Sequence, residues 1–222
     1  WNTVNFDDSK WNGVGYRAVP SQNVVSQQVQ PIRAVETIPV KIWKKLNDTT
    51  YVFDFARNMA GVTRIKVSGE EGTVVRLKHG ERLYDNGRVN TSNIDVYHRP
   101  VDNSDPFQTD ILVLSGKGED EFMARFNYKG FRYVEVTSTN PLVLNENNLT
   151  AYFVHSDVPQ KGMIHTSNAL INRLWWATNN AYLSNLMGYP TDCPQREKNG
   201  WTGDGHFAIE TALYLSLIHI SE

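Results

Sequence analysis

The sequence predicts a multidomain β-plus-α fold in which an antiparallel β-sandwich precedes a group of helices. Short β-type runs separated by turn residues fill residues 37–154, with no helical pattern between them. From about Pro159 the apolar period changes to three and four residues, which is typical of amphipathic helices. The composition agrees with an ordered globular protein, since 40% of the 222 residues are hydrophobic and 11% are aromatic.

The charge balance argues against several classes of partner. A net charge of −2 at pH 7 provides no broad basic field, so neither a nucleic acid nor an anionic membrane is predicted as a partner. No apolar run reaches the length that spans a bilayer. The sequence begins at Trp1 rather than Met, so we expect the natural start to lie upstream, and periplasmic, extracellular and cytoplasmic locations all stay open.

The first 36 residues show no regular period. The adjacent carboxylates of Asp7 and Asp8 could ligate calcium, but without spaced partner oxygens turn capping is the better interpretation. We therefore expect no metal ion and no cofactor. Residues 12–36 are rich in glutamine and interrupted by two prolines, which is typical of an extended connector.

Several β-type runs alternate as half-buried strands do. Arg64 and Lys66 alternate with Ile65 and Val67, and Glu135 lies between valines, so we expect the charged side chains to face water and the aliphatic ones the core. The candidate strands are Ile38–Trp43, Thr50–Phe55, Val62–Val67, Thr73–Lys78, Asp110–Leu114, Phe131–Thr137 and Leu149–Val154, with glycine-containing turns at 69–72, 85–87 and 116–118.

Aromatic residues are frequent in the predicted sheet and have two possible roles. An exposed row could bind carbohydrate, whereas inward-facing rings would fill the interior of the sandwich, and we favour the interior. His79, Glu81 and Tyr84 have no partner spacing that indicates chemistry and are interpreted as structural. The aromatic residues in question are Phe53, Phe55, Phe122, Phe126, Tyr128, Phe131 and Tyr133.

An amphipathic helix is predicted over Asn168–Met187. Thr166 or Ser167 provides a candidate N-cap, and Gly188 and Pro190 end the pattern. Its apolar residues are Leu170, Ile171, Leu174, Trp175, Thr178, Tyr182, Leu183 and Leu186. The helix therefore leads the chain directly into the segment that carries most of its candidate chemistry, as rigid elements that position functional loops do.

That segment is 191–204, TDCPQREKNGWTGD, and it holds the carboxylates of Asp192, Glu197 and Asp204. Prolines before it and glycines behind it predict a shaped loop rather than a helix or strand, and such a loop could turn all three carboxylates into one pocket. Glycoside cleavage needs this kind of cluster, and Trp201 could supply a platform for a sugar face. The alternative is a surface loop whose charges are solvated.

Cys193 is the only cysteine, which excludes an internal disulfide. A thiol mechanism would need a base, and His206 is the nearest candidate along the sequence. Because no oxyanion-binding device is visible, we interpret Cys193 as a packing residue of the loop. Apolar residues within 207–214 predict a second helix after the loop.

The string TDCPQREKNGWTGD resembles the signature of bacterial α-L-rhamnosidases of glycoside hydrolase family 78, in which an Asp-Cys-Pro-Gln-Arg-Glu run precedes Gly-Trp-Thr-Gly-Asp. The resemblance implies that Glu197 is the general acid and that Asp192, Trp201 and Asp204 line the sugar site. Arg196, a planar fork of donors, could hold one of these carboxylates charged and in place.

The same resemblance implies a domain organisation. The implied parts are residues 1–36 as the remnant of a lectin-like domain with a linker, residues 37–158 as a central β-sandwich, and residues 159–214 as the first helices of a truncated (α/α)6 barrel. The final LSLIHISE, residues 215–222, does not continue the family pattern and is interpreted as a translated library adaptor, so His219 and Glu222 are expected to have no role.

The expected activity is release of terminal α-L-rhamnose from a rhamnose-containing glycoside or polysaccharide, with inversion. In the family the general base comes from later in the barrel, beyond Tyr214, so this chain alone is expected to be inactive. Two alternatives stay open. One is a non-catalytic carbohydrate-binding sandwich, and the other is a related helical-barrel glycosidase with a different sugar specificity.

Overall fold

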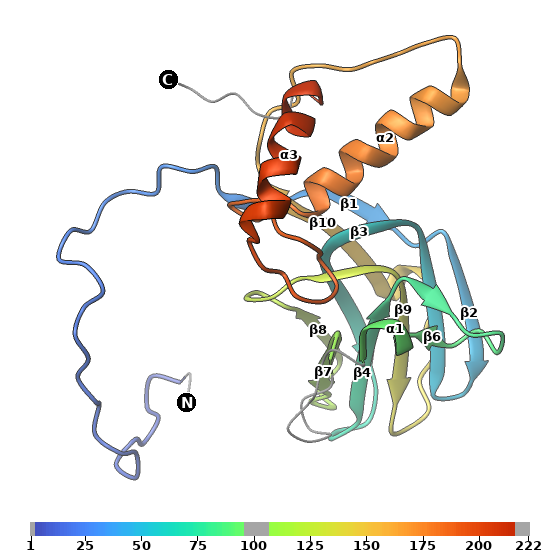
Figure 1. Cartoon of the computed structure of the whole chain (residues 1–222). Coiled ribbons are helices and arrows are strands. Elements are labelled where there is room, and N and C mark those ends of the chain that lie inside the picture. Colours follow the sequence, from blue (N-terminus) through green and yellow to red (C-terminus); the bar gives the residue numbers. More distant parts are fainter. Residues whose placement is uncertain (1–2, 96–106, 216–222) are drawn as a thin grey trace.

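The computed structural model describes residues 3–95 and 107–215, and within them a large antiparallel sheet lies beside two long helices (Figure 1). The sheet-then-helix order confirms the predicted fold class. The strands are β1 (Ile32–Pro39), β2 (Ile42–Asn47), β3 (Thr50–Ser68), β4 (Val74–Gly80), β5 (Arg82–Leu83), β6 (Val89–Asn90), β7 (Thr109–Val113), β8 (Glu119–Met123), β9 (Lys129–Ser138) and β10 (Leu149–Ser156), and the helices are α1 (Ser92–Asp95), a 3-10 turn Glu146–Asn148, α2 (Ala169–Ser184) and α3 (Thr202–Tyr214).

The main sheet has the strand order β1-β10-β3-β9-β4-β7, and β2 and β8 add to it by pairing with β3. Strand β3 is 19 residues long and pairs with four neighbours, with β2 and β9 along its first part and with β10 and β8 along its second. The predicted strands Thr50–Phe55 and Val62–Val67 are therefore two parts of one strand. Strands β5 and β6 form a separate pair.

Strand β3 is interrupted at its middle. Its register with β9 shifts between Asp54 and Met59, and Ala56 has a φ of 57°, a conformation that costs an L-residue about 1 kcal/mol. The Asp54 carboxylate compensates by accepting the Ala56 amide at 2.6 Å and two hydrogen bonds from Arg132 at 2.8 Å. At the interruption, Arg57 and Asn58 leave the ladder between β3 and β9.

The core lies on the inner face of the curled sheet. Phe53, Phe55 and Phe131 are almost completely buried there, and each gains about 1.5–3 kcal/mol from leaving water. The interior interpretation is confirmed for these three residues and wrong for Phe126, which is fully exposed in the connection between β8 and β9. Phe122 packs partly against the core. Tyr128 and Tyr133 are half-buried, so Phe126 is the one exposed residue among the seven predicted core aromatics.

The alternation of charged and aliphatic residues predicts burial well in β3 and less well in β9. Ile65 and Val67 are buried, and Arg64 and Lys66 are partly exposed, as expected. Glu135 of β9 was expected to face water but is only 3% exposed.

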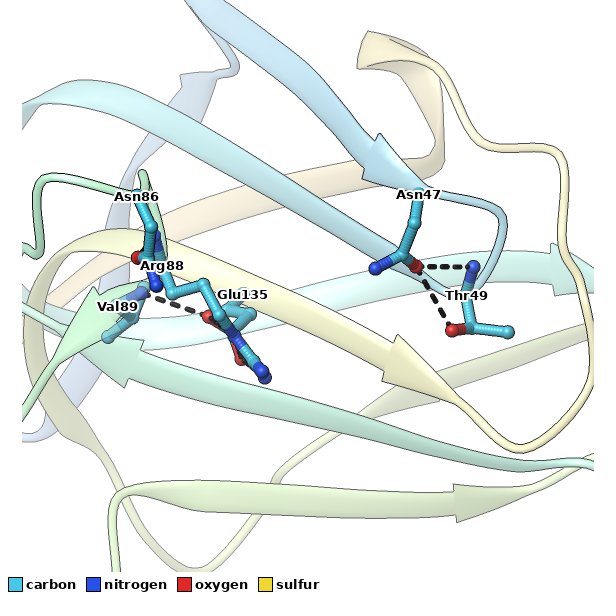
Figure 2. A network of polar contacts seen from close by, with 6 residues as sticks. All are labelled: Asn47, Thr49, Asn86, Arg88, Val89 and Glu135. Carbon is cyan, nitrogen blue, oxygen red and sulfur yellow. Dashed lines mark hydrogen bonds and ion pairs between the residues drawn. The ribbon is translucent and has the colours of Figure 1, made fainter.

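Figure 2 shows why the buried carboxylate is tolerated. Arg88 forms an ion pair with Glu135 at 2.6 Å, and the Val89 amide donates to the same carboxylate at 2.9 Å. These charge-assisted bonds offset the cost of desolvating Glu135. Side-chain hydrogen bonds also stabilise two short turns near the sheet (Figure 2). Asn47 accepts hydrogen bonds from Thr49 in one turn, and Asn86 accepts the Arg88 amide at 3.0 Å in the other.

His79 agrees with the structural interpretation. Its ring is fully buried, contacts Thr63 Oγ1 at 2.9 Å and the Gln108 carbonyl at 3.2 Å, and packs edge-on against Phe131. Burial lowers the pKa of His79 to about 4, so the ring is neutral at pH 7.

The predicted connector is partly wrong. Residues 3–31 contain neither helix nor strand (Figure 1), and residues 3–30 are exposed, but β1 begins at Ile32, which pairs with Ser156 of β10. Partner strands distant in sequence supply that ladder, so local composition could not reveal it. The candidate strand Ile38–Trp43 is likewise divided between β1 and β2 at Val40 and Lys41.

Helix α2 runs from Ala169 to Ser184, so it is shorter at both ends than the predicted Asn168–Met187, and neither predicted cap is the N-cap. Asn168 is the N-cap, and its side chain accepts the amides of Leu170 and Ile171 at 2.9 and 3.4 Å. Thr166, one of the predicted caps, bonds instead to Asn172 further along the helix. No helix in the described part of the chain has the length and apolar character required to cross a membrane.

The interruption of β3 is where α2 docks on the sheet. Arg57 donates to Asn180 at 2.6 Å and lies over the rings of Phe153 and Trp176. Arg57 also forms an ion pair with Glu36 of β1 at 2.6 Å. One side chain therefore joins two strands to the helix that leads into the acidic loop.

Candidate active site

The acidic loop connects α2 to α3. The Thr191 amide donates to the Asn185 carbonyl at 2.7 Å, which turns the chain back from the end of α2. The prediction of a shaped loop is correct up to Trp201 and wrong beyond it, because Thr202 already begins α3. Gly203 and Gly205 lie inside this helix, at a cost of about 1 kcal/mol each relative to alanine.

Asp192 closes the loop on itself. Its backbone amide donates to the Asn199 carbonyl at 2.9 Å, and its carboxylate accepts the Asn199 amide at 2.8 Å. Burial alone raises the pKa of Asp192, but hydrogen bonds from Cys193 and the Asn199 amide outweigh it and hold this pKa below its usual value. Asp192 is therefore a charged carboxylate at neutral pH and fixes both ends of the bend.

Cys193 takes part in the same arrangement. Its thiol donates to Asp192 at 2.8 Å, and its sulfur accepts the Glu197 amide at 3.3 Å. His206, the base considered for a thiol mechanism, packs its ring against Phe207 of α3. These contacts favour the packing interpretation of Cys193.

Glu197 lies at the tip of the bend with its carboxylate held from two sides. Arg196 contacts one oxygen at 3.0 Å, and the indole nitrogen of Trp201 donates to the other at 3.0 Å. The Glu197 side chain is 36% exposed, so a ligand can reach it. In its protonated form, an oriented and accessible carboxyl group beside an indole ring can transfer a proton to a bound sugar.

The described hydrogen bonds and ion pairs connect most of the predicted site residues. Arg196 and Trp201 each contact the Glu197 carboxylate, and Cys193 links the Glu197 amide to the Asp192 carboxylate, which also accepts the Asn199 amide. Asp204 is outside these contacts and lies exposed in the first turn of α3. Convergence of the three carboxylates on one sugar stays a prediction.

A hollow of about 620 Å³ lies beside Trp201. Its walls come from both ends of the loop and from the first turns of α3. The lining residues are Tyr189, Pro190, Gly200, Trp201, Thr202, Gly205, His206 and Ile209. None of the three carboxylates is among these residues, so Trp201 is the member of the predicted site that borders the hollow.

Sequence reasoning missed Lys198. Its ammonium group donates to the Tyr128 carbonyl at 2.5 Å and lies 4.6 Å from the centre of the Tyr128 ring. Burial, followed by the charge of nearby Lys129, lowers the pKa of Lys198 to about 8. Position 198 lies inside the motif, but nothing in the local pattern indicates that its partner is Tyr128, 70 residues earlier and directly before β9.

Residues 44–155, half of the chain, match the family model of the bacterial alpha-L-rhamnosidase concanavalin-like domain. The chain belongs to the bacterial α-L-rhamnosidase family. A second match, to the 6 hairpin glycosidase domain of the same family, covers residues 159–219. That match extends into residues 215–222, which were interpreted as a library adaptor. Residues 216–222, with His219 and Glu222, lie outside the described residues. The adaptor interpretation therefore stays a prediction.

Several proteins with the name of the family are similar to the chain. An α-L-rhamnosidase from Streptomyces avermitilis is 33% identical over 96% of the chain, which covers 20% of that protein, and one from Formosa agariphila is 30% identical, with 22% of its length covered. The structure of an α-L-rhamnosidase from Dictyoglumus thermophilum matches with a TM-score of 0.82 at 36% identity. The matched region covers 96% of this chain and 23% of that enzyme. The chain thus spans about a fifth of the length of these family members.

Proposed function

We propose that the protein containing this chain is a glycoside hydrolase that releases terminal α-L-rhamnose by an inverting mechanism, with Glu197 as the general acid. Family membership supports the class of reaction. A crystal structure of the Streptomyces avermitilis enzyme, 33% identical and with a TM-score of 0.75, is described as complexed with L-rhamnose, which supports the sugar. The matched region covers 90% of this chain and 19% of the Streptomyces avermitilis enzyme.

The observation that carries the proposal is the pair of contacts on the Glu197 carboxylate. Arg196 and Trp201 hold one oxygen each, so the group has a fixed direction while remaining accessible. Protonation of a glycosidic oxygen needs a carboxylic acid within hydrogen-bond reach, and orientation reduces the entropy lost in reaching that geometry. Trp201 offers its ring as the surface against which the sugar packs.

The other carboxylates have binding roles in this proposal. Asp192 is charged and fixed by Asn199, so it can accept hydrogen bonds from sugar hydroxyls without moving. Asp204 lies exposed at the start of α3, where its carboxylate accepts hydrogen bonds from hydroxyl groups of the same sugar. A second carboxylate activates water on the opposite side of the ring, at the separation of about 6.5–9.5 Å that inversion requires.

The test compares three variants in the complete gene product. Glu197→Gln removes the proton donor and keeps the shape, so kcat on an alkyl rhamnoside should fall by about 10²–10⁴, the usual contribution of general acid catalysis. Asp192→Asn keeps an oxygen for the Asn199 amide and should mainly raise KM. Glu210→Gln, on the exposed side of α3, is the matched control. Near-normal turnover by the Glu197 variant removes the acid assignment.

Sugar specificity is tested separately. The complete gene product is assayed on aryl α-L-rhamnoside beside other aryl glycosides of the same leaving group. Preference for the rhamnoside by kcat/KM supports the proposal, because that ratio measures discrimination in the transition state. Preference for another sugar would instead support a related helical-barrel glycosidase, and binding without turnover would support a carbohydrate-binding module.

A further inference from the structure

The start of β9 contacts the acidic loop at several points. Tyr128 and Gly130 lie where the chain enters β9, and they meet Lys198 and Gln195 of the loop. The sandwich therefore contacts the loop on both sides of Glu197 in sequence.

Gly130 is the point of closest approach. A Cβ built at Gly130 would lie 2.7–3.0 Å from the backbone nitrogen, Cα and Cβ of Gln195, closer than real Cβ atoms come to other heavy atoms. The neighbouring atoms belong largely to backbone, so they cannot rotate away. Gly130 is also fixed on its own side, because its carbonyl accepts the Gln108 side chain at 2.7 Å. Any side chain at this position must push the loop off β9.

Lys198 makes the second contact and directly follows Glu197. Its φ is 57°, a conformation that is unfavourable for a residue with a side chain and is retained only where surrounding contacts hold it. The bond to the Tyr128 carbonyl and the position over the Tyr128 ring supply those contacts. The charged groups nearest to this ammonium are Lys129 and Asp110, which form a buried ion pair with each other.

We propose that Lys198 is a positioning residue that, together with the close approach at Gly130, clamps the acidic loop to the start of β9 and so sets the direction of Glu197. This proposal rests on the proposed function, because it concerns the acid of that reaction. In this proposal Lys198 acts through the position of Glu197 and not on the sugar, and its ammonium group donates to the Tyr128 carbonyl. The residues that hold the loop therefore lie in the sandwich, which contains no part of the motif 191–204.

The first arm of the test measures docking without any substrate. Amide hydrogen exchange of residues 191–201 is recorded in the complete gene product, in Lys198→Met and in Gly130→Ala. We expect protection of this segment to fall about tenfold or more in both variants, because the loop opens more often. Lys198→Arg retains a donor and should restore part of the protection.

The controls use the same substitutions at positions without such contacts. Lys117→Met changes an exposed lysine in the turn between β7 and β8. Gly15→Ala adds a Cβ that meets no atom within 4 Å. Both should leave the exchange of 191–201 unchanged, which separates the clamp from general effects of losing a lysine or a glycine.

The second arm measures whether the clamp serves the acid. A good aryl leaving group departs with little protonation, whereas an alkoxide needs the acid, so misplacement of Glu197 should slow alkyl rhamnosides selectively. We expect the ratio of kcat for aryl to kcat for alkyl rhamnoside to rise about tenfold in Lys198→Met, with KM little changed. A merely destabilised protein would lose both rates in proportion.

Each outcome decides one point. Unchanged exchange in Lys198→Met overturns the clamp. Lost protection with an unchanged aryl-to-alkyl ratio keeps the docking contact and overturns the positioning of the acid. If the unsubstituted protein cleaves no rhamnoside of either kind, the proposed function fails and the role toward the acid fails with it, while the exchange data still decide whether the sandwich holds the loop.

Discussion

The sandwich and the helical part of this chain bury their apolar residues to very different extents. The sandwich has a continuous interior to which several strands contribute phenylalanine, leucine and valine. The helical part has a small cluster of Tyr182, Leu186, Ala212 and Leu215, and most other large apolar side chains of α2 and α3 are exposed. Phe207, for example, is 79% exposed.

The difference shows where the order of the candidate site comes from. The sandwich can hold its shape by burial, because its apolar residues leave water within the described chain. The acidic loop is only partly buried and is held in addition by polar contacts, with Arg57 joining α2 to the sheet and Lys198 joining the loop to the start of β9. A rigid platform thus supports a segment that is weakly packed by itself.

The largest expected effect is loss of a sandwich ring. Phe131→Ala leaves a cavity among Phe55 and His79, and we expect it to lower the free energy of unfolding by about 3–5 kcal/mol. In the chain of residues 1–222, Phe207→Ala on α3 should change it by no more than about 0.5 kcal/mol, because the ring is 79% exposed there. Urea unfolding followed by circular dichroism measures both, and equal losses would show that the helical part is packed as tightly as the sandwich.

Acid should weaken the sandwich next. The folded pKa of His79 is about 4 and its unfolded value about 6.5, so its neutral form stabilises the fold fully above pH 6.5 and this contribution is lost as the pH falls from 6.5 towards 4. We expect a loss of roughly 3 kcal/mol, from a difference of about 2.5 pKa units.

Matched substitutions isolate this response. His79→Gln stays neutral at every pH, so its unfolding free energy should fall less between pH 7 and pH 4 than that of the unsubstituted protein. His206→Gln, at an exposed position on α3, is the control for the loss of an imidazole. Parallel pH curves for the His79 variant and the parent would contradict the prediction.

A smaller effect is expected at the junction of sheet and helix. Arg57→Met removes the bonds to Glu36 and Asn180 and should cost about 1–2 kcal/mol, expressed as faster hydrogen exchange within α2. Arg64→Met is the matched control, since Arg64 lies on the same strand over the Tyr152 ring and away from α2. Similar exchange of α2 in both variants would show that Arg57 does not hold the helix.

The smallest effect is expected on the exposed face of α2. Leu174→Gln should change the urea midpoint by less than the equivalent of about 0.5 kcal/mol, because this side chain is 58% exposed. Leu186→Ala, in the buried cluster with Tyr182, should cost about 2 kcal/mol. A large loss in the Leu174 variant would reveal packing on that face.

The sandwich was predictable because alternation records burial directly. Ile65 and Val67 in β3 follow the expected pattern, and the turn glycines 72, 87 and 116 adopt the positive φ for which turns select glycine. The prediction failed where partners lie far apart in sequence. Burial of Glu135 depends on Arg88, and the start of β1 depends on β10, so no local window contains the cause.

The candidate site was predictable as a motif and less so as a geometry. The contact of Glu197 with Arg196 and Trp201 follows from residues within five positions of one another. Lys198 was overlooked because its partner is a backbone carbonyl, which every residue possesses and no sequence pattern marks. The start of α3 at Thr202 was misjudged since tertiary context overrode the low helix propensity of Gly203 and Gly205.

The place of β10 in the sheet has a consequence for biosynthesis. Strand β10 inserts between β1 and β3, so neither neighbour completes its ladder until Ser156 has left the ribosome. Pairing over such separations is slow, and domains nearer the N-terminus generally fold first as translation proceeds. The acidic loop is made only after that closing strand, so every strand of its dock is synthesised before the loop.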